Sequence, residues 1–392
     1  MAVRSWLRTL VAGPAAARLA GCGAADRAVL NAPRCPDGPA ARPAGRYVPA
    51  GPVWAWSPHL DAPPGGGVEG PVPGWSDVVS VADAGCTTVA VRADGTVWSY
   101  GTNVEGSLGH GYRERRYEAR PRRVAGIDDA RAVYASGPTF FAVRRDGTVM
   151  AWGADRFLVE AGKRRGHGGV PVPRRVPGLE DVVEVAPGLL NSFALRTDGR
   201  VRGWGVNVTE VLGDTHGTRL TTVGGVTQVA SAGGAVVARR AGGRVCAWGN
   251  NAHGLLGVEP RGGQSAAPLL VPGLRDVVQV AGGDDVAYAL DRHGRVWAWG
   301  RGAGGALGDG DRSQHALARP VRVARLPGIR RVAAFGRTGL AIDTGGGLWG
   351  WGSALGLGRH ADRETARPVR IPLPGRAVEV SGHHVILAAP LP

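Results

Sequence analysis

Short apolar or alternating runs separated by turn residues recur along most of this chain. In one copy Val78–Ala82 is followed by Gly85, by Thr87–Arg92, by Asp94-Gly95 and by Thr96–Tyr100. Runs of this kind are typical of β-strands, and Asp-Gly between two of them is the strongest short-range signal for a hairpin. The turn recurs as Asp146-Gly147 and Asp198-Gly199, and in altered form as Gly242-Gly243, His293-Gly294 and Gly345-Gly346. With no helical periodicity between the runs, the pattern predicts an all-β chain.

An aromatic residue followed by a small one marks each copy, at intervals of 44 to 52 residues. The aromatics are Trp56, Tyr100, Trp152, Trp204, Trp248, Trp299 and Trp351. Self-similarity at such a period indicates a repeat architecture, in which each unit buries its apolar face only against its neighbours. For an all-β unit of this length we expect a β-propeller.

The two ends of the chain carry complementary fragments of the repeat. Val53–Trp56 supplies only the strand that ends in the aromatic, whereas Ala377–Val380 and His384–Ala389 supply only the first two strands. Pairing them completes one blade and removes the exposed sheet edges. Six whole copies and one composite copy predict a seven-bladed β-propeller, closed by pairing of the N-terminal strand with the C-terminal hairpin.

The segment after the aromatic carries a family resemblance. Tyr100–Gly111, YGTNVEGSLGHG, resembles the repeat signature of the regulator of chromosome condensation family, with weaker copies at Trp248–Gly257 and Trp299–Gly310. The resemblance covers Tyr47 to Ala389 and implies a propeller in which the leucine fills a gap between adjacent blades. Positions where the family usually has a histidine hold other residues, namely Thr88, Phe140, Asn191, Val236 and Val286.

The chain is strongly basic, with a net charge of +15 and Lys163 as its only lysine. An excess of this size suits an acidic partner. Arginine beside abundant Gly, Ala and Pro is also typical of a chain encoded by a GC-rich genome, so composition explains the charge at least as well.

The first residues differ from the repeats. Arg4 and Arg8 precede a short apolar run that ends in Leu19-Ala20-Gly21-Cys22. This order is typical of an export signal and is too short to span a membrane. The tetrapeptide resembles a bacterial lipoprotein box, which makes Cys22 the lipidation candidate. Plain secretion and an unprocessed cytoplasmic leader remain open, the latter because Arg18 interrupts the run.

We therefore divide the chain into three parts. Residues 1–22 form an export or lipoprotein-like signal, 23–46 an Ala/Pro-rich tether, and 47–392 the propeller. The predicted location is the cell envelope, lipid-anchored or secreted, or the cytoplasm if the leader is not processed.

The sequence offers no catalytic, metal or cofactor site. There is no GxSxG, HExxH or phosphate-binding loop, and Gly300, Gly302 and Gly305 fit GxGxxG only as part of the repeat's own turn. The four cysteines predict no disulfide framework, and Cys86 and Cys246 are expected to be small buried residues of separate blades. His383 and His384 are expected to point to opposite sides of one strand.

Basic residues follow several of the aromatics. We expect the segments after the third strands to emerge as loops on one face of the disc, where the candidates for partner binding form an electropositive arc. They are Arg113, Arg115, Arg116, Arg122, Arg123, Lys163, Arg164 and Arg165. The alternative is a solvated surface that maintains solubility.

Three classes of function remain. The leading prediction is a monomeric, non-enzymatic binding or scaffold module of the bacterial envelope. Its expected partner is a protein, which could be acidic, and a polysaccharide is also open. Nucleic acid is disfavoured, and membrane contact is confined to the N-terminal lipid. The family resemblance implies instead a guanine-nucleotide exchange factor for a small GTPase. The third class is a secreted protein inhibitor of an enzyme. Fold alone does not choose among them.

Overall fold

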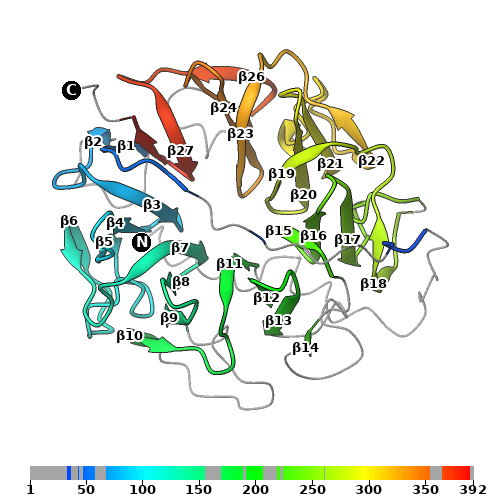
Figure 1. The fold of residues 1–392 in the computed structure, drawn as a ribbon. Helices are drawn as coiled ribbons and strands as arrows, with labels where there is room; N and C mark the ends of the chain where they lie inside the picture. The colour runs from blue at the N-terminus through cyan, green and yellow to red at the C-terminus, as the bar shows by residue number, and fades with distance from the viewer. Residues whose placement is uncertain are drawn as a thin grey trace.

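A computed structural model gives the fold for residues 33–36, 43, 47–57, 68–154, 169–188, 191–205, 219–220, 224–259, 261–353 and 364–388. These residues form seven four-stranded antiparallel sheets arranged around a central axis (Figure 1). The predicted all-β, seven-bladed propeller is confirmed.

Six blades use consecutive strands, with the first strand of each nearest the axis. Blade 1 is β3 (Val78–Asp83), β4 (Thr87–Arg92), β5 (Val97–Thr102) and β6 (Tyr117–Arg123). Blade 2 is β7 (Ala130–Ser136), β8 (Thr139–Arg144), β9 (Val149–Gly153) and β10 (Val170–Arg175), and blade 3 is β11 (Val182–Pro187), β12 (Asn191–Arg196), β13 (Val201–Gly205) and β14 (Arg219–Leu220). Blade 4 is β15 (Val226–Ala232), β16 (Ala235–Arg240), β17 (Val245–Asn250) and β18 (Gln264–Leu270), and blade 5 is β19 (Val277–Gly282), β20 (Val286–Asp291), β21 (Val296–Arg301) and β22 (Ala316–Arg322). Blade 6 is β23 (Ile329–Phe335), β24 (Thr338–Asp343), β25 (Leu348–Gly352) and β26 (Thr365–Ile371).

The seventh sheet joins the two ends of the chain. Its order is β2 (Val68–Pro71), β1 (Val53–Ser57), β28 (His384–Leu387) and β27 (Ala377–Ser381). Trp54 lies opposite Val385 and Ala55 opposite His384 across the β1–β28 pair. In Figure 1 this closing blade brings the blue β1 and β2 beside the red β27. The predicted closure is therefore confirmed.

The Asp-Gly turns fix the register between the second and third strands. In blade 1 the Asp94 carboxylate accepts hydrogen bonds from the Thr96 amide (2.8 Å) and hydroxyl (2.7 Å). Gly95 has φ of +91°, and a Cβ there would lie 2.6 Å from the carbonyl oxygen of Asp128. Asp146 and Thr148 repeat the arrangement in blade 2. The turn thus also sets the contact with the next blade, which explains its recurrence.

A valine near the middle of every first strand forms the inner core. The seven positions are Val81, Val133, Val185, Val229, Val280, Val332 and Val380, each at most 6% exposed. Because these side chains and the repeat aromatics lie at equivalent places in every blade, neighbouring blades bury a continuous apolar seam.

The fourth strand of each blade was not predicted from the sequence. These strands run along the outside of the disc, and β6, β10, β22 and β26 are mostly exposed or half-buried. Arg122 and Arg123 lie in β6, so the expectation that they belong to a loop is wrong. Arg123 pairs with Trp98 at the start of β5. It therefore lies at the opposite end of the blade from the loop that leaves β5.

A disulfide between Cys35 and Cys246 contradicts the cysteine prediction. The two residues are 211 positions apart in the chain, with Cα atoms 5.9 Å apart. Residues 33–36 lie along the outer edge of β18, where the Cys35 amide donates to Pro268 O and the Leu270 amide to Pro33 O, each at 2.9 Å. Cys86 carries a thiol and lies in the turn before β4, not in a strand.

Candidate binding surfaces

In blades 1, 4 and 5 the loop that follows the third strand is held by the aromatic of the next blade. The indole Nε1 of Trp152 donates to Ser107 O at 2.8 Å, that of Trp299 to Leu255 O at 2.9 Å, and that of Trp351 to Ala306 O at 3.1 Å. Each tryptophan is fully buried. Leu256 and Leu307, the leucines of the repeat signature, pack in the same clusters as Trp299 and Trp351, as the family resemblance implied. A repeat aromatic therefore positions a loop as well as filling the core.

An asparagine organises the best preserved loops from inside. In blade 1 the Leu108 amide donates to Asn103 Oδ1 at 3.0 Å, while Asn103 Nδ2 donates to Tyr112 O and Glu114 O. In blade 4 the Leu256 amide and Val258 O make the same contacts with Asn251. Both asparagines are at most 1% exposed. These loops are thus built before any partner arrives.

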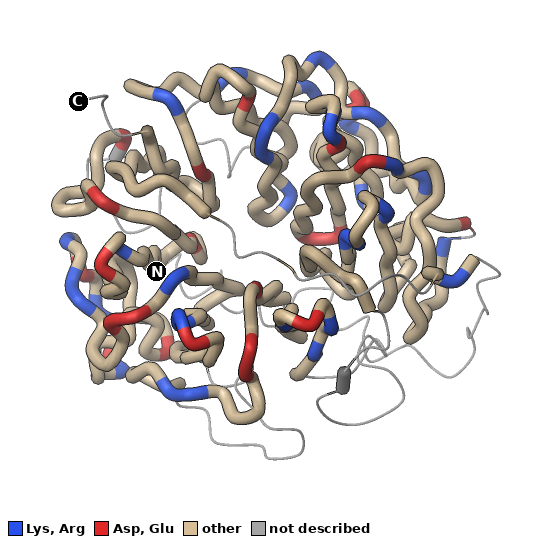
Figure 2. The backbone as a smooth tube through the Cα atoms, viewed as in Figure 1, with Lys and Arg blue, Asp and Glu red and all other residues tan. Residues whose placement is uncertain are grey.

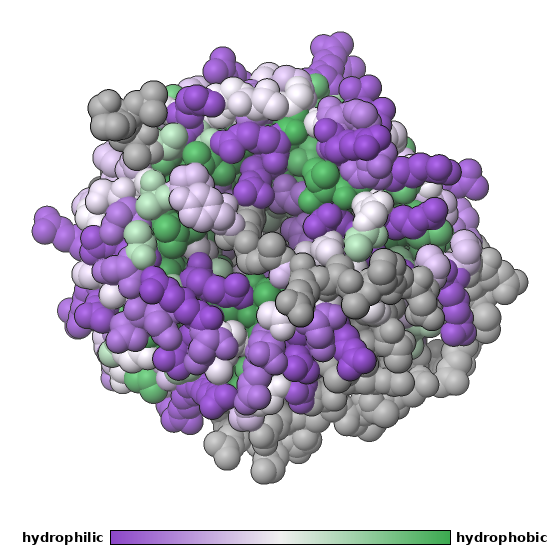
Figure 3. Space-filling view, in the orientation of Figure 1, coloured by the Kyte–Doolittle hydropathy of each residue, from purple (hydrophilic) through white to green (hydrophobic). Residues whose placement is uncertain are grey.

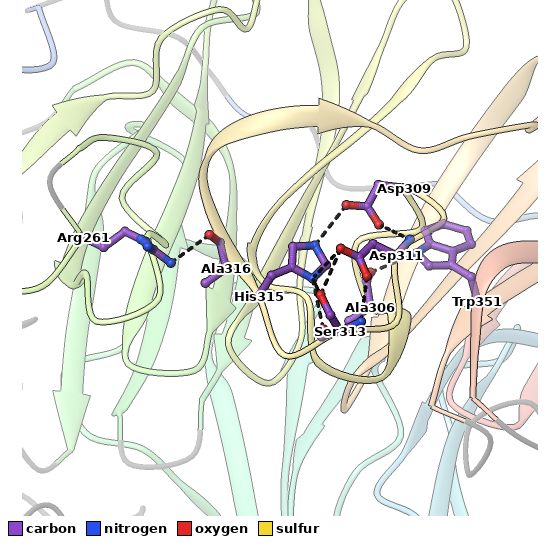
Figure 4. Close-up of polar contacts among 8 residues, drawn as sticks. All are labelled: Arg261, Ala306, Asp309, Asp311, Ser313, His315, Ala316 and Trp351. Atoms are coloured by element: carbon purple, nitrogen blue, oxygen red, sulfur yellow. Dashed lines mark hydrogen bonds and ion pairs between the residues drawn. The ribbon is translucent and has the colours of Figure 1, made fainter.

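The loop of blade 5 is organised around a histidine (Figure 4). His315 Nε2 lies 3.1 Å from Asp309 Oδ2, and its Nδ1 lies 3.0 Å from Ser313 O and 3.7 Å from Asp311 Oδ2. Burial lowers the pKa of His315, but Ser313 O and the two carboxylates outweigh burial, so the pKa is raised. Gly300, Gly302 and Gly305 belong to this strand end and turn, as expected. Arg261 of the blade 4 loop donates to Ala316 O at 3.0 Å, which joins that loop to the start of β22 in blade 5.

A cavity of about 1390 Å³ occupies the centre of the disc, lined by the first strands of the blades. Figure 3 shows hydrophilic side chains around the periphery and several apolar ones around the central hollow. Along its wall, polar side chains link blades 3 to 6 in sequence: Glu184 accepts from the Val229 amide, Gln228 from Val280 and Gln279 from Val332, at 2.8–3.2 Å. Much of the polarity of the cavity wall is thus already used in holding the ring together.

Asp83 lies where blade 1 meets the closing blade, and it contacts both His383 and His384, which were expected to point to opposite sides of a strand. Its Oδ2 accepts from the His383 amide at 2.8 Å and lies 3.2 Å from Nδ1 of both His383 and His384. The prediction that the two histidines point apart is wrong because His383 belongs to the turn before β28, where strand alternation does not apply. Figure 1 places β3 and β27 side by side at this junction.

The electrostatics of this cluster favour an ionised carboxylate. Burial raises the pKa of Asp83, but the attraction of His384 and hydrogen bonds from both histidines outweigh it and bring that pKa far below its usual range. His384 Nε2 lies 2.5 Å from the Tyr100 hydroxyl, and burial raises the pKa of Tyr100. Both ring nitrogens of His384, a residue only 4% exposed, are therefore engaged. The cluster joins blade 1 to the closing blade, and Asp83 and His383 also line the central cavity.

The predicted binding residues lie in two different places. Arg113, Arg115 and Arg116 are exposed in the loop after β5, whereas Arg122 and Arg123 are exposed on the rim. Glu118 lies 3.5 Å from both Arg116 and Arg122. Figure 2 shows Lys and Arg spread along the periphery of the disc. Cys22 and the group Lys163, Arg164 and Arg165 lie outside the described residues.

The closed ring and its preformed loops define a class of repeat propeller that is generally a binding or regulatory fold. The sequence profile of the RCC1-like domain matches residues 62–387. The chain belongs to the RCC1-like domain family.

Curated relatives lie at modest identity. The mitochondrial RCC1 domain-containing protein RUG3 of Arabidopsis thaliana is 29% identical over 58% of this chain, and protein pim1 of Schizosaccharomyces pombe is 27% identical over 63%. The chain spans about half the length of these two relatives, 55% and 50%. The ultraviolet-B receptor UVR8 of Arabidopsis thaliana is 26% identical over 77% of this chain and 72% of its own length.

Solved structures agree on the fold. Human WBSCR16 superposes with a TM-score of 0.73 at 21% identity, covering 88% of this chain and 99% of its own. Prp20p of Saccharomyces cerevisiae, described with its binding properties to Gsp1p and histones, gives a TM-score of 0.70 at 20% identity, covering 87% and 92%. Among the described residues, no helix is long and apolar enough to cross a membrane.

Proposed function

We propose that this chain is a non-enzymatic binding module of the bacterial cell envelope that engages an acidic protein through its loop face. The observation that carries the proposal is the preorganisation of that face. Asn103 and the Trp152 indole fix the blade 1 loop, in which Arg113, Arg115 and Arg116 are exposed. Fixing a loop before binding lowers the entropy lost on association, and exposed arginines attract an acidic surface.

The envelope location is supported by two features of the chain. The N-terminal residues through Cys22 have the order of an export signal with a lipoprotein box. The Cys35–Cys246 disulfide is of a kind that persists in oxidising compartments and is rare in the cytosol. Lipid on Cys22 would supply the membrane attachment. Changing Cys22 to Ser should then release the protein from the membrane fraction, and an intact Met1 in the purified protein would argue against export.

The partner site is tested by charge removal in matched groups. One variant carries Arg113→Ser, Arg115→Ser and Arg116→Ser; the control carries Arg319→Ser, Arg322→Ser and Arg367→Ser, which removes the same charge from exposed positions of other outer strands. Proteins captured from a native envelope extract are compared at low and moderate salt. A partner of the loop face should be lost with the first variant and with added salt, and kept by the control. Equal loss in both variants would indicate only general attraction to a basic surface, and capture of a polysaccharide would replace the protein partner.

A guanine-nucleotide exchange activity is the second candidate, and it is supported by the family and by the fold of Prp20p. It requires residence in the cytoplasm, which the disulfide disfavours. The direct test is nucleotide release from the small GTPases of the source cell. Acceleration by the wild-type chain and not by the loop variant would support it over the envelope proposal. For the third class, an enzyme inhibitor, no contact among the described residues is specific support.

A further inference from the structure

The Cys35–Cys246 disulfide lies against a buried arginine. The Arg240 Nη1 is 3.6 Å from Cys35 Sγ, while Nε and Nη2 donate to Gly224 O at 3.1 and 2.8 Å. Arg240 is only 4% exposed. A guanidinium held beside a sulfur favours the thiolate form over the thiol, and thiolate stability governs disulfide exchange.

Blade 4 departs from its neighbours at this point. Arginines at the same position in blades 1 to 3 pair with a carboxylate 15 residues earlier: Arg92 with Asp77, Arg144 with Asp129 and Arg196 with Asp181, at 2.7, 2.6 and 3.2 Å. The residue 15 positions before Arg240 is Gly225. The repeat's usual carboxylate is therefore replaced by glycine in the one blade where the arginine meets a disulfide.

The edge that residues 33–36 cover is also unlike the other outer strands. Exposed arginines lie opposite the second residue of the third strand in blades 1, 2, 5 and 6, namely Arg123, Arg175, Arg322 and Arg370. The equivalent residue of β18 is Leu270, opposite Cys246. Charged residues protect an outer strand from pairing with another chain. On β18 the edge is covered by residues 33–36 and not by charged residues.

We propose that Cys35–Cys246 is a thiol–disulfide exchange site, at which an external thiol detaches residues 33–36 and opens the edge of β18. Cys35 is partly exposed and Cys246 is fully buried, so the incoming thiolate attacks the sulfur of Cys35. The Cys35–Cys246 bond breaks, a mixed disulfide forms at Cys35, and Cys246 leaves as a thiolate that takes up a proton. A second thiolate then attacks the mixed disulfide, releasing the reductant as its own disulfide and Cys35 as a thiolate beside Arg240.

The opened edge would present backbone groups for strand addition. The Leu270 N–H and Pro268 C=O, now bonded to Pro33 and Cys35, would face solvent. Strand addition to such an edge draws its affinity from main-chain hydrogen bonds. The site is independent of the loop face proposed above, because it lies on the rim of blade 4.

The experiment follows reduction of the oxidised full chain under native conditions. Dithiothreitol is added, thiols are trapped by alkylation and assigned by peptide mass, and hydrogen exchange is read on the peptide containing Leu269–Leu270. We expect Cys35 and Cys246 to become alkylated while the ring stays folded, and the Leu270 amide to lose protection at the same time. Protection in the equivalent part of blade 1, around Arg123 and Val124, should not change.

A matched pair of variants tests the role of Arg240. Arg240→Gln should slow the second step, in which Cys35 leaves as a thiolate beside Arg240, by about threefold, since one unit of thiol pKa changes the exchange rate by about that factor; with a monothiol reductant the mixed disulfide at Cys35 should accumulate. Arg196→Gln, the same change at the equivalent position of blade 3, should leave the rate unaltered, and Arg240→Lys should restore part of it. Should Arg240→Gln perturb the blade, Cys35→Ala in the wild-type background must still expose Leu270 without reductant.

Two results would overturn the proposal. One is a bridge that reduces only as fast as the whole ring unfolds, which would make it a purely structural cross-link. The other is native-state reduction with Leu270 still protected, which would show that residues 33–36 stay in place without the bond.

Discussion

Replacing Asp83 with Asn should destabilise the whole ring through the junction between blade 1 and the closing blade. The change keeps the size of the side chain but removes the charge that the His383 and His384 rings face at 3.2 Å. It also puts an amide group among donors, beside the Gly85 amide at 2.7 Å and the His383 amide at 2.8 Å. Removing one partner of a buried ionic cluster typically costs about 3–5 kcal/mol. That is a large share of the about 5–15 kcal/mol that usually separates folded from unfolded protein.

The assay is urea unfolding followed by tryptophan fluorescence. With a slope of about 3 kcal/mol per molar urea, the midpoint should fall by about 1–2 M. Asp77→Asn is the matched control, since Asp77 pairs with Arg92 at 2.7 Å but its side chain is 34% exposed. An ion pair at the surface contributes about 0–1 kcal/mol. Equal shifts for the two variants would refute the idea that Asp83 is special.

The pH dependence gives a second measure of the same cluster. Because the pKa of Asp83 is lower in the folded state than in the unfolded chain, its contribution is present above the unfolded value of about 4 and is lost as pH falls toward the folded value. Stability of the wild type should therefore fall more steeply than that of Asp83→Asn between about pH 4 and pH 2. Parallel curves would contradict the assigned shift.

Three further predictions concern the loops and the closure. Trp152→Phe removes the bond to Ser107 O, so it should lower the free energy of unfolding by about 1 kcal/mol and increase hydrogen exchange in residues 103–109. Trp98→Phe is the control: it loses only a bond to Thr96 in its own hairpin and should leave hydrogen exchange in that loop unchanged. The pKa of His315 is raised in the folded state, so its stabilising effect is full below the pKa of about 6.5 in the unfolded chain and is lost as pH rises through the pKa in the folded state. Protection of residues 302–316 from hydrogen exchange, corrected for the intrinsic rate, should therefore fall between about pH 6 and pH 8 in the wild type but not in His315→Asn. A chain that starts at Asp61 lacks β1 and should unfold at a lower temperature as a whole; cooperative unfolding at the parent temperature would speak against closure by β1.

The sequence predicts the blades well because local signals repeat in register. Asp94-Gly95 and its equivalents fix each hairpin, and the repeat aromatics mark where the third strand ends. The fourth, outer strand of each blade has no such local signal. In β6 only Glu118 and Pro121 are half-buried and the rest are exposed, so no alternation of apolar and polar residues marks it as a strand, and Arg122 and Arg123 read as loop residues.

The contacts between distant parts of the chain were missed for a different reason. Nothing local relates Cys35 to Cys246 across 211 positions, and nothing local relates Asp83 to His383. One signal was available in the repeat itself. Trp56 lies opposite His383 as Tyr100 lies opposite Thr88, so His383 occupies the position at which the family usually has its histidine. The histidine absent from the internal copies is thus present in the closing blade.

The indole bonds have a consequence for synthesis of the chain. Ser107, Leu255 and Ala306 each accept from a tryptophan 44 or 45 residues further on. A loop is therefore complete only after the next blade has been made, a delay of about 2–9 s at about 5–20 residues per second. These three loops acquire their final shape in order from the N-terminus, each only after the next blade has been made. A chain that stops before Trp152, Trp299 or Trp351 would consequently carry an unfinished loop in the blade before it.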